Sequence, residues 1–561
     1  MAELESKHNI VVEHHAFDAD EINQVKTKYI DEYPIVYILN QGKQSSNRPK
    51  AYIGETVNMH NRMRAHLKNK ERKILTEVWF IGQEYFNKSA TYNIETNLIN
   101  YFIADGQYTL QNTSQTAQTS MHDYYKKAYY DQDVFEEIWN RLRVEGLAKD
   151  TTDTLKNKDI YKLSPFKTLS QSQLELKENI LDFCRQVMSQ KTKQKHLYLI
   201  KGEAGTGKSV VLSSLFNTIQ EEARAKGQHG GLHGTKNYLL VNHPEMLKTY
   251  EGISEALPHL RKSDFKKPTT FVNKTEDDAA DIVLIDEGHL LLSTSDNYNN
   301  FKGDNHLDEI MKKAKVVVMI YDEKQYLKMK SRWTGDILKE TLANYSYTKF
   351  ELTDQFRMIA SEEMVQWVDD FVARQINPFP DAGENFEFQV ISNPEAFKQY
   401  IRDKNDEVGL SRIVSTFDYE HKKNGGTFYV DEEGINMPWN TTNSKITWSE
   451  RPETIDEVGS IYTVQGFDLN YVGVVLGPSV DYDFDKDQII LDVRQYKDIG
   501  ALTGANSLAT EEERIAAKEQ IILNSINILM KRGIHGLALY AVNENLRKKL
   551  LMMQEEAKHN D

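Results

Sequence analysis

Short apolar runs that stop abruptly at glycine, acidic or polar residues recur along this chain. Such runs predict strands buried on both faces. A helix is predicted after the first of them, from Ser209, and buried strands joined through helices are typical of α/β proteins. The runs between residues 190 and 480 are His196–Ile200, Asp281–Ile285, Val316–Ile320 and Tyr471–Leu476.

The first 115 residues have a different order of elements. A strand, a polar turn and a short second strand closed by Gly54 predict a hairpin, because turn residues separate two apolar runs. Two helices are predicted to follow. This order indicates a small α+β module over residues 31–115, after an N-terminal extension of residues 1–30. The predicted elements are strands Tyr33–Leu39 and Ala51–Ile53 and helices Val57–Lys70 and Ile94–Ile103.

The run that ends at Ile200 leads into a sequence that fits the G-x-x-x-x-G-K-[ST] pattern of a phosphate-binding P-loop. Glycines allow backbone N–H groups to crowd round phosphate oxygens, and the N-terminus of the next helix adds partial positive charge. We expect Lys208 to reach the β- and γ-phosphates and the Ser209 hydroxyl to hold Mg²⁺. The predicted nucleotide-binding residues of this loop are Gly202, Gly205, Thr206, Gly207, Lys208 and Ser209.

The run that ends at Ile285 is followed by two acids, Asp286 and Glu287. A carboxylate at the end of a strand beside the P-loop can steady Mg²⁺, and an adjacent glutamate can orient the attacking water. We therefore assign Asp286 to the metal and Glu287 to catalysis. The predicted cofactors are ATP and Mg²⁺ or Mn²⁺.

Length and composition limit the class of protein. At 561 residues the chain exceeds a single hydrophobic core, so about three or four domains are expected. We find no apolar run near the ~20 residues that span a bilayer and no signal peptide, so a cytoplasmic protein without a membrane partner is predicted. The single cysteine, Cys184, excludes internal disulfides and is expected to be a small core residue.

The formal net charge is −15, which argues against a protein whose whole surface binds nucleic acid. Basic residues nevertheless gather between Arg62 and Lys73 in the N-terminal module. This segment either meets phosphates or forms a solvated helix face, and charge alone does not separate the two.

The N-terminal module also carries residues at the spacings of the GIY-YIG endonuclease domain, which it resembles. The two name-giving triplets stand here as Ile35-Val36-Tyr37 and Tyr52-Ile53-Gly54, so isoleucine replaces the first glycine. Because position 35 lies in a predicted strand, we expect this change to alter packing more than chemistry. The other matching residues are Arg62, His66, Glu95 and Asn112.

The resemblance implies metal-dependent cleavage of phosphodiesters. It implies that Glu95 holds one divalent metal and that Tyr37 or Tyr52 deprotonates or positions the attacking water. It further implies that Arg62 neutralises charge on the scissile phosphate, with His66 in the same catalytic set.

Further stretches resemble the motifs of superfamily 1 helicases in their order along the chain. The resemblance implies that Gln173 contacts adenine, that Gln325 senses the γ-phosphate, and that Gly466 lies in a motif that couples nucleic acid to ATP. Arg357 and Arg532 are implied to be arginine fingers, which stabilise charge only when the cleft between two domains closes. The sequence also resembles the Schlafen group 3-like helicase family of bacteria, particularly at Asp286-Glu-Gly-His289, Gln355-Phe-Arg357 and Val464-Gln-Gly-Phe467. The stretches are Asp322-Glu-Lys-Gln325, Gln355-Phe-Arg357, Thr463-Val-Gln-Gly466 and Lys531-Arg-Gly533.

Between the module and the motor, residues 116–165 are predicted to form a connector that is partly helical and partly flexible. Its tyrosines either pack against the motor or stack on bases. The motor is expected to be α/β, with two RecA-like parallel-sheet domains. These domains are residues 166–355 and residues 356–552, the second with a small insertion, followed by a tail of residues 553–561.

These features predict an ATP-dependent helicase or translocase with a tethered endonuclease that cuts DNA, in defence against phage or foreign DNA. DNA repair is an alternative role. A nucleotide-gated sensor that binds nucleic acid without unwinding it is an alternative activity. RNA remains open as the substrate, and so does assembly with a second copy or a partner protein.

Overall fold

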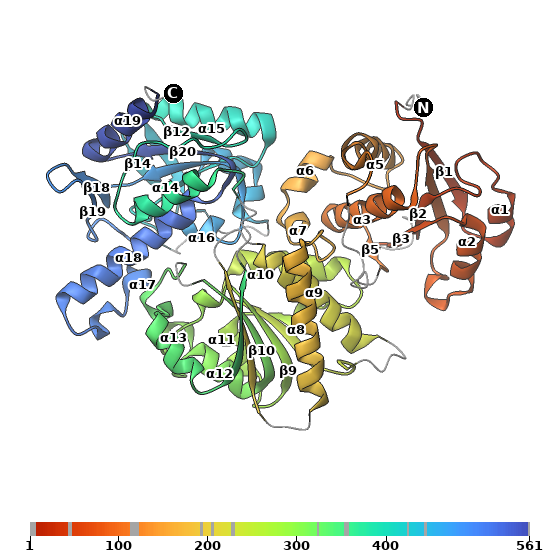
Figure 1. Cartoon of the computed structure of the whole chain (residues 1–561), viewed down its shortest axis with the longest axis horizontal. Coiled ribbons are helices and arrows are strands. Elements are labelled where there is room, and N and C mark those ends of the chain that lie inside the picture. Colours follow the sequence, from red (N-terminus) through yellow and green to blue (C-terminus); the bar gives the residue numbers. More distant parts are fainter. Residues whose placement is uncertain are drawn as a thin grey trace. The chain divides into compact units, whose positions relative to one another are not determined.

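The computed structural model describes residues 7–42, 48–112, 123–190, 194–202, 207–225, 231–322, 325–352, 358–422, 426–441 and 446–558 (Figure 1). The chain forms two compact units. Unit 1 combines residues 1–186, 209–234 and 249–265, and unit 2 combines residues 187–208, 235–248 and 266–561. Within the described ranges, no helix has both the length and the apolar composition that a membrane crossing requires.

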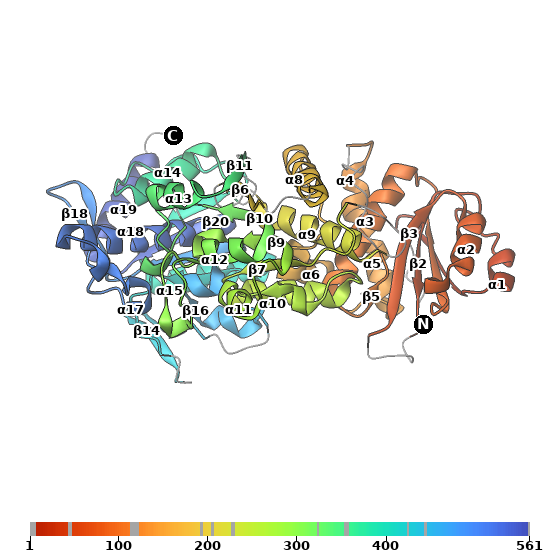
Figure 2. The same cartoon turned by 90° about the horizontal axis from the view of Figure 1, so that it is seen from below.

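Unit 1 begins with a five-stranded sheet in the order β1-β4-β2-β3-β5. Its neighbouring strands are antiparallel except β3 and β5. Helices α1 and α2 lie on one side of the sheet and α3 on the other, as Figures 1 and 2 show from two directions. The predicted hairpin and both predicted helices are confirmed. The bounds are β1 (Val11–Ala16), α1 (Ala19–Gln24), β2 (Ile35–Asn40), β3 (Lys50–Thr56), α2 (Met59–Lys68), β4 (Glu77–Gly82), α3 (Lys88–Asp105) and β5 (Thr109–Leu110).

Strand β2 is buried along its whole length because both faces of the sheet are covered. Side chains alternate between the faces of a strand. Ile35, Tyr37 and Leu39 therefore share one core with Met63 of α2, while α3 contacts β2 as well. Ile35, which stands where the GIY-YIG family has glycine, is a fully buried core residue, in line with the expected effect on packing.

Residues 123–165 of the connector pack against α3, whereas the stretch expected to be flexible, Thr113–Ser120, lies outside the described residues. The Trp139 ring lies 5.2 Å from the Tyr101 ring and 5.7 Å from the Phe102 ring, measured between centroids. Lys158 Nζ donates a hydrogen bond to the Ala104 carbonyl at 3.2 Å. The partly helical character is confirmed by α4 (Lys127–Tyr129), α5 (Phe135–Val144), α6 (Thr152–Asn157) and α7 (Asp159–Lys162).

The tyrosines of the connector do not share one role. Tyr130 is buried, and its hydroxyl donates to the Tyr85 carbonyl at 2.7 Å. It therefore packs within unit 1, on the N-terminal module. Tyr125 is 84% exposed, so burial does not explain it.

The first motor sheet contains three of the predicted apolar runs and lies mostly in unit 2. Its order is β11-β6-β10-β9-β7-β8, and the strands from β11 to β7 pair in parallel. The predicted strands at residues 196, 281 and 316 are confirmed as β6, β9 and β10. The bounds are β6 (His196–Gly202), β7 (Asn237–Val241), β8 (Phe265–Lys266), β9 (Ala280–Asp286), β10 (Ala314–Tyr321) and β11 (Ser346–Leu352).

A second sheet of unit 2 has the order β12-β20-β17-β13-β16-β15-β14 and is parallel apart from an antiparallel pair, β14 and β15, at one edge. Gly473 lets α15 approach β17, because a Cβ there would lie 2.8 Å from the Ile401 side chain. The strand predicted at residue 471 is confirmed as β17. The bounds are β12 (Glu387–Val390), β13 (Arg412–Ser415), β14 (Phe428–Glu432), β15 (Ile435–Trp439), β16 (Val458–Gly459), β17 (Leu469–Leu476) and β20 (Gly533–Ala541), with a separate hairpin of β18 (Val480–Asp483) and β19 (Gln488–Leu491).

Helices connect and cover these strands. Cys184 of α8 is buried, in line with its expected place in a core. The bounds are α8 (Gln171–Ser189), α9 (Lys208–Arg224), α10 (Pro244–Ala256), α11 (Pro268–Lys274), α12 (His306–Lys313), α13 (Gly335–Leu342), α14 (Glu362–Val372), α15 (Pro394–Val408), α16 (Ile461–Val464), α17 (Ile499–Leu502), α18 (Glu511–Met530) and α19 (Glu544–Lys558).

The contact of Trp139 with α3 is testable by hydrogen exchange. Trp139 is fully buried, and its Nε1 donates to the Asp150 carbonyl at 2.9 Å. Trp139→Ala is expected to lower the free energy of local unfolding of α3 and α5 by about 3–5 kcal/mol, because a large cavity is left. Val144→Ala, on the exposed side of α5, is the matched control. Equal amide exchange in both variants would show that this contact does not hold the connector.

Candidate nucleotide site and N-terminal polar cluster

The turn between β6 and α9 has the features of a phosphate cradle at its described ends. Gly207 has a φ of 71°, in the left-handed region that favours glycine. Lys208 Nζ donates to the Gly202 carbonyl at 2.8 Å, so the ammonium group lies at the end of β6. Ser209 follows in the first turn of α9. Two predicted residues of this loop lie outside the described residues, namely Gly205 and Thr206.

Asp286 ends β9 at the same sheet edge where β6 ends. Strand β10 pairs in parallel with both β6 and β9, so the carboxyl ends of all three strands point to one side. Asp286 is 1% exposed, and its Oδ1 accepts a hydrogen bond from the Glu287 backbone N at 3.0 Å. A carboxylate at this position is a ligand type that Mg²⁺ prefers. The donor therefore fits the ion that accompanies a nucleoside triphosphate.

Glu287 is held by a cluster of charges at that edge. Its backbone has a φ of 51°, and its Oε2 lies 3.0 Å from His289 Nε2. Burial by itself raises the pKa of Glu287, but His289, Lys208 and Arg532 hold that pKa below its ordinary value. The carboxylate is therefore ionised at neutral pH, as a residue that orients water requires.

His289 is a residue that the sequence prediction missed. It is buried, and its Nε2 lies 3.4 Å from the Nε2 of Gln465, which follows β16. A histidine two residues after the strand-end acids was the available clue. It links Glu287 to the segment that carries Gly466.

Arg532 does not extend as a free finger here. It is 1% exposed, and its Nη1 donates to the Phe467 carbonyl at 3.0 Å and lies 3.9 Å from Asp468 Oδ1. Its charge still acts on Glu287. Arg532 therefore lies near the carboxyl edge of the first sheet, but its side chain is buried and bonded to the protein.

Two other predicted residues have visible structural roles. Gly466 has a φ of 87°, and a Cβ there would lie 2.4 Å from Met246 Sδ, so only glycine fits. Gln325 is buried, and its Nε2 donates to Asp322 Oδ2 at 2.5 Å. Gly466 therefore allows a close approach to α10, and Gln325 fixes the side chain of Asp322 at the end of β10.

Gln173 belongs to unit 1. Its Oε1 accepts from the Ser170 backbone N at 2.9 Å, which caps the start of α8. Arg357, the other predicted arginine finger, lies outside the described residues.

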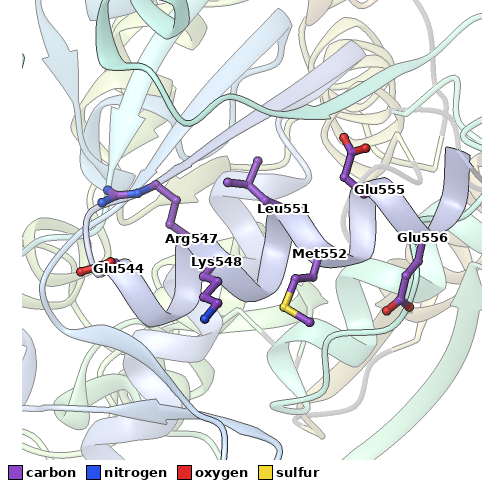
Figure 3. Close-up of a pocket in the computed structure, with 7 residues that line it drawn as sticks. All are labelled: Glu544, Arg547, Lys548, Leu551, Met552, Glu555 and Glu556. Carbon is purple, nitrogen blue, oxygen red and sulfur yellow. The ribbon is translucent and has the colours of Figure 1, made fainter.

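A pocket along α19 is distinct from the predicted site. All seven side chains that line it belong to this one helix, as Figure 3 shows. It contains none of the predicted nucleotide-binding residues. The lining residues are Glu544, Arg547, Lys548, Leu551, Met552, Glu555 and Glu556.

In unit 1, four of the predicted catalytic residues form one polar cluster. Arg62 Nε donates to the Tyr37 hydroxyl at 2.9 Å, and Arg62 Nη2 donates to the Tyr52 hydroxyl at 3.3 Å. The Tyr37 hydroxyl lies 2.7 Å from His66 Nε2. Because Arg62 has only donors, the Tyr37 oxygen accepts from Arg62 and its proton is directed to His66.

Both members of the Tyr37–His66 pair are neutral at physiological pH. Burial, followed by the nearby Arg72 and Arg62, lowers the pKa of His66 to about 3. Burial and the neighbouring Tyr52 raise the pKa of Tyr37 well above its ordinary value. The pair is therefore a hydroxyl donor and a neutral imidazole acceptor.

Backbone constraints hold the two tyrosines in place. A Cβ at Gly54 would lie 2.3 Å from the Tyr37 hydroxyl oxygen, so glycine is required where the ring crosses β3. Asn112 bonds both backbone groups of Ile53, accepting from its N at 3.1 Å and donating to its O at 2.8 Å. Gly54 therefore makes room for the Tyr37 ring, and Asn112 fixes the strand backbone next to Tyr52.

Glu95 lies half-buried on α3, near the cluster. Burial and the charge of Glu55 raise the pKa of Glu95 to about 8, against the opposing effect of Arg62. Among the described residues, no group of three or more His, Cys, Asp or Glu is arranged to hold a metal ion. A lone carboxylate still fits Mg²⁺, which keeps several waters and takes one or two protein carboxylates.

Arg72 is a second residue that the sequence prediction missed. Its Cζ lies 3.2 Å from the centroid of the Tyr52 ring. Its place in the basic segment after α2 was the only clue.

Comparisons with known proteins concern mainly the motor. The family model described as Schlafen group 3, DNA/RNA helicase domain, matches residues 195–543. "Uncharacterized protein YPL245W" of Saccharomyces cerevisiae (strain ATCC 204508 / S288c) is 39% identical over 414 residues, which cover 68% of this chain and 90% of the yeast protein.

Two solved structures are also similar. The PRRSV helicase aligns with a TM-score of 0.28 and 10% identity over 66% of this chain and 56% of that chain, so the chain spans little more than half its length. The Pif1 helicase from Candida albicans aligns with a TM-score of 0.26 and 12% identity over 70% of this chain and 99% of that chain. Because the family match covers more than half of the sequence and includes the P-loop, Asp286 and Arg532, the chain belongs to the Schlafen group 3 DNA/RNA helicase family.

Proposed function

We propose that this chain is an ATP-hydrolysing nucleic-acid motor joined to a metal-dependent endonuclease of the GIY-YIG type that cuts DNA. Membership of the helicase family supports the motor. The observation that carries the nuclease is the Tyr37–His66 hydrogen bond with Arg62 donating to the same hydroxyl.

In the motor, the P-loop backbone and Lys208 bind the phosphates of ATP. Asp286 and Ser209 would hold the Mg²⁺ that accompanies ATP, and the ion offsets phosphate charge. Glu287, ionised and held by His289, accepts a hydrogen bond from the attacking water. Arg532 and Arg357 serve as the charge-stabilising arginines, so hydrolysis depends on the arrangement of the two sheets.

In the nuclease, the neutral Tyr37–His66 pair accepts the proton of the attacking water. As the water oxygen forms its bond to phosphorus, one water proton passes to the Tyr37 oxygen and the Tyr37 proton passes to His66 Nε2. The bond from phosphorus to the leaving sugar oxygen breaks, and that oxygen takes a proton from solvent. A bound phosphate would offset the charge of Arg62, which removes one of the effects that lower the pKa of His66 besides burial.

Two residues act on the phosphate itself. Arg62 remains accessible to solvent and stabilises the charge that develops on the phosphate oxygens. Glu95 would hold a divalent metal, which supplies Lewis-acid stabilisation of the same charge when bound.

The proposal is tested on the full chain with plasmid, linear duplex, single-stranded DNA and RNA, each with Mg²⁺ or Mn²⁺ and with or without ATP. We expect metal-dependent cutting of DNA that falls about 10²-fold or more in Glu95→Ala. ATPase activity that single-stranded DNA does not stimulate would favour a nucleotide-gated sensor. Cutting of damaged rather than foreign DNA would favour repair over defence.

Lys208→Ala is expected to abolish ATP hydrolysis and to leave the fold intact, because the lysine charge is directed at phosphates rather than at packing. ATP turnover and circular dichroism are the measurements. Lys349→Ala, which removes an exposed ion pair with Glu351, is the matched control. Unchanged turnover in Lys208→Ala would overturn the P-loop assignment.

Asp286→Ala and Glu287→Gln are expected to separate binding from hydrolysis. Asp286→Ala should weaken Mg²⁺-dependent nucleotide binding, whereas Glu287→Gln should bind ATP and hydrolyse it about 10²-fold more slowly. Binding of a fluorescent ATP analogue and phosphate release are measured in parallel. An equal loss of binding in both variants would contradict this division of roles.

The raised pKa of Glu95 predicts that metal affinity depends on pH. Below about pH 8 the carboxyl group is protonated and cannot bind metal, so apparent Mn²⁺ affinity for cutting should rise up to about tenfold per pH unit until pH 8. Removing the charge of Glu55 in Glu55→Gln should lower the pKa of Glu95 and move the plateau to lower pH. Identical profiles in the parent and in Glu55→Gln would contradict the prediction.

A further inference from the structure

Two guanidinium groups converge on Tyr52. Arg62 Nη2 reaches the hydroxyl at 3.3 Å, and Arg72 lies over the face of the same ring at 3.2 Å from its centroid. Arg62 comes from α2, and Arg72 comes from the short 3₁₀ turn that follows that helix. One segment of the chain thus brings two permanent positive charges to the ring of one predicted catalytic residue.

Neither charge is compensated inside the protein. Within the described ranges, neither Arg62 nor Arg72 forms an ion pair with a carboxylate, and Arg72 Nη1 is buried without a hydrogen-bond partner. Arg224, another partly buried arginine of unit 1, is by contrast paired with Asp264 at 2.7 Å. A buried guanidinium donor without a partner is unfavourable, so this pair of cations is arranged for an anion that comes from outside.

We propose that Arg72 binds a non-bridging oxygen of the scissile phosphate beside Arg62, as a second phosphate-binding cation of the N-terminal site. This inference rests on the proposed endonuclease function. The phosphorus centre carries more negative charge in the transition state of hydrolysis than in the bound diester, so two guanidiniums stabilise the transition state more than the substrate.

The accessibility of the cluster agrees with this assignment. Arg62 is exposed and Tyr52 and Glu95 are half-buried, whereas Tyr37 and His66 lie behind them. A phosphate that enters from solvent therefore meets the guanidiniums before the Tyr37–His66 pair. Exposed lysines flank the turn and can meet neighbouring phosphates of the same strand, namely Lys68, Lys70 and Lys73.

Electrostatics supply a second link. After burial, Arg72 and then Arg62 are the charges that lower the pKa of His66. An anion bound by both guanidiniums would remove this effect, so Arg72 connects phosphate binding to the basicity of the proton acceptor. A purely structural role for Arg72, as a flat group packed on Tyr52, does not require an anion.

The test uses the full chain with Arg72→Met, which keeps an unbranched apolar stem on the ring, and Arg72→Lys, which keeps the charge without the planar fork. Arg64→Met is the matched control, because Arg64 is exposed on α2, the helix before the turn that carries Arg72, and donates to Asn23 at 3.2 Å. ATPase activity and circular dichroism monitor folding. Where Arg72→Met fails to fold, Arg72→Lys carries the measurement.

After the cut site is mapped on a duplex oligonucleotide, kcat and KM are measured with a phosphate and with each phosphorothioate diastereomer at that position. We expect kcat to fall about 10²-fold in Arg72→Met, less in Arg72→Lys, and within about twofold in Arg64→Met. In the parent, replacing the non-bridging oxygen that Arg72 contacts by sulfur should lower kcat for one diastereomer. In Arg72→Met the same replacement should have no further effect, because the contact between residue 72 and that oxygen is already lost.

The outcomes distinguish failure of the proposed endonuclease from failure of the proposed role of Arg72. A parent that does not cut, or Glu95→Ala that cuts as fast as the parent, overturns the proposed endonuclease and this inference with it. A parent that depends on Glu95 while Arg72→Met cuts at the parental rate overturns only the role of Arg72. The role of Arg72 is also overturned if, for both diastereomers, Arg72→Met and the sulfur substitution lower kcat by independent factors.

Discussion

The carboxylate of Glu287 is held at the carboxyl edge of the first motor sheet with a side chain only 12% exposed. A carboxylate removed from water must be compensated or it becomes protonated. His289 supplies the direct contact, with its Nε2 3.0 Å from Glu287 Oε2, and the charges of Lys208 and Arg532 contribute further. Arg532 immediately precedes β20 of the second sheet, so compensation of this one charge links the strand ends of both sheets within unit 2. Gly466, which follows α16, also lies close to Met246 of α10 within unit 2.

The N-terminal cluster has the opposite balance. There the fixed charges are cations. The groups nearest to them are the Tyr37 phenol and the His66 imidazole, both kept neutral by burial, and the ring of Tyr52. A nucleotide site can compensate its charges in advance because the ligand arrives with its own metal ion. In the proposed phosphodiester site, the cations have no carboxylate partner, so the substrate would supply the compensating charge.

Helix α3 connects this cluster to the rest of unit 1. It carries Glu95 near the tyrosines, and its Tyr101 and Phe102 contact the connector through Trp139. These contacts lie about two turns beyond Glu95 along α3, so the connector supports the helix that presents the carboxylate. A change in connector packing therefore acts on the position of a predicted metal ligand, a route that a flexible tether would not offer.

The sequence by itself determined the elements whose cause is local. Apolar runs such as 281–285 ended where β9 ends, because a strand buried on both faces needs an uninterrupted apolar segment. The residues of the Tyr37 cluster were predicted from their resemblance to the GIY-YIG motifs. That match is visible in the sequence because a hairpin and the following helix keep positions 37, 52, 62 and 66 close along the chain. The P-loop pattern and Asp286 were predicted for the same reason.

Tertiary structure alone decided which distant groups meet. Nothing in the spacing places His289 beside Gln465 or folds residues 123–165 onto α3, because these contacts depend on how surfaces pack rather than on local periodicity. The basic segment after α2 was equally compatible with a solvated face. Only the turn at the end of that helix decides that Arg72 lies over Tyr52 while its lysine neighbours stay in solvent. Charge compensation is a property of the assembled site, so it was not predictable from the order of residues.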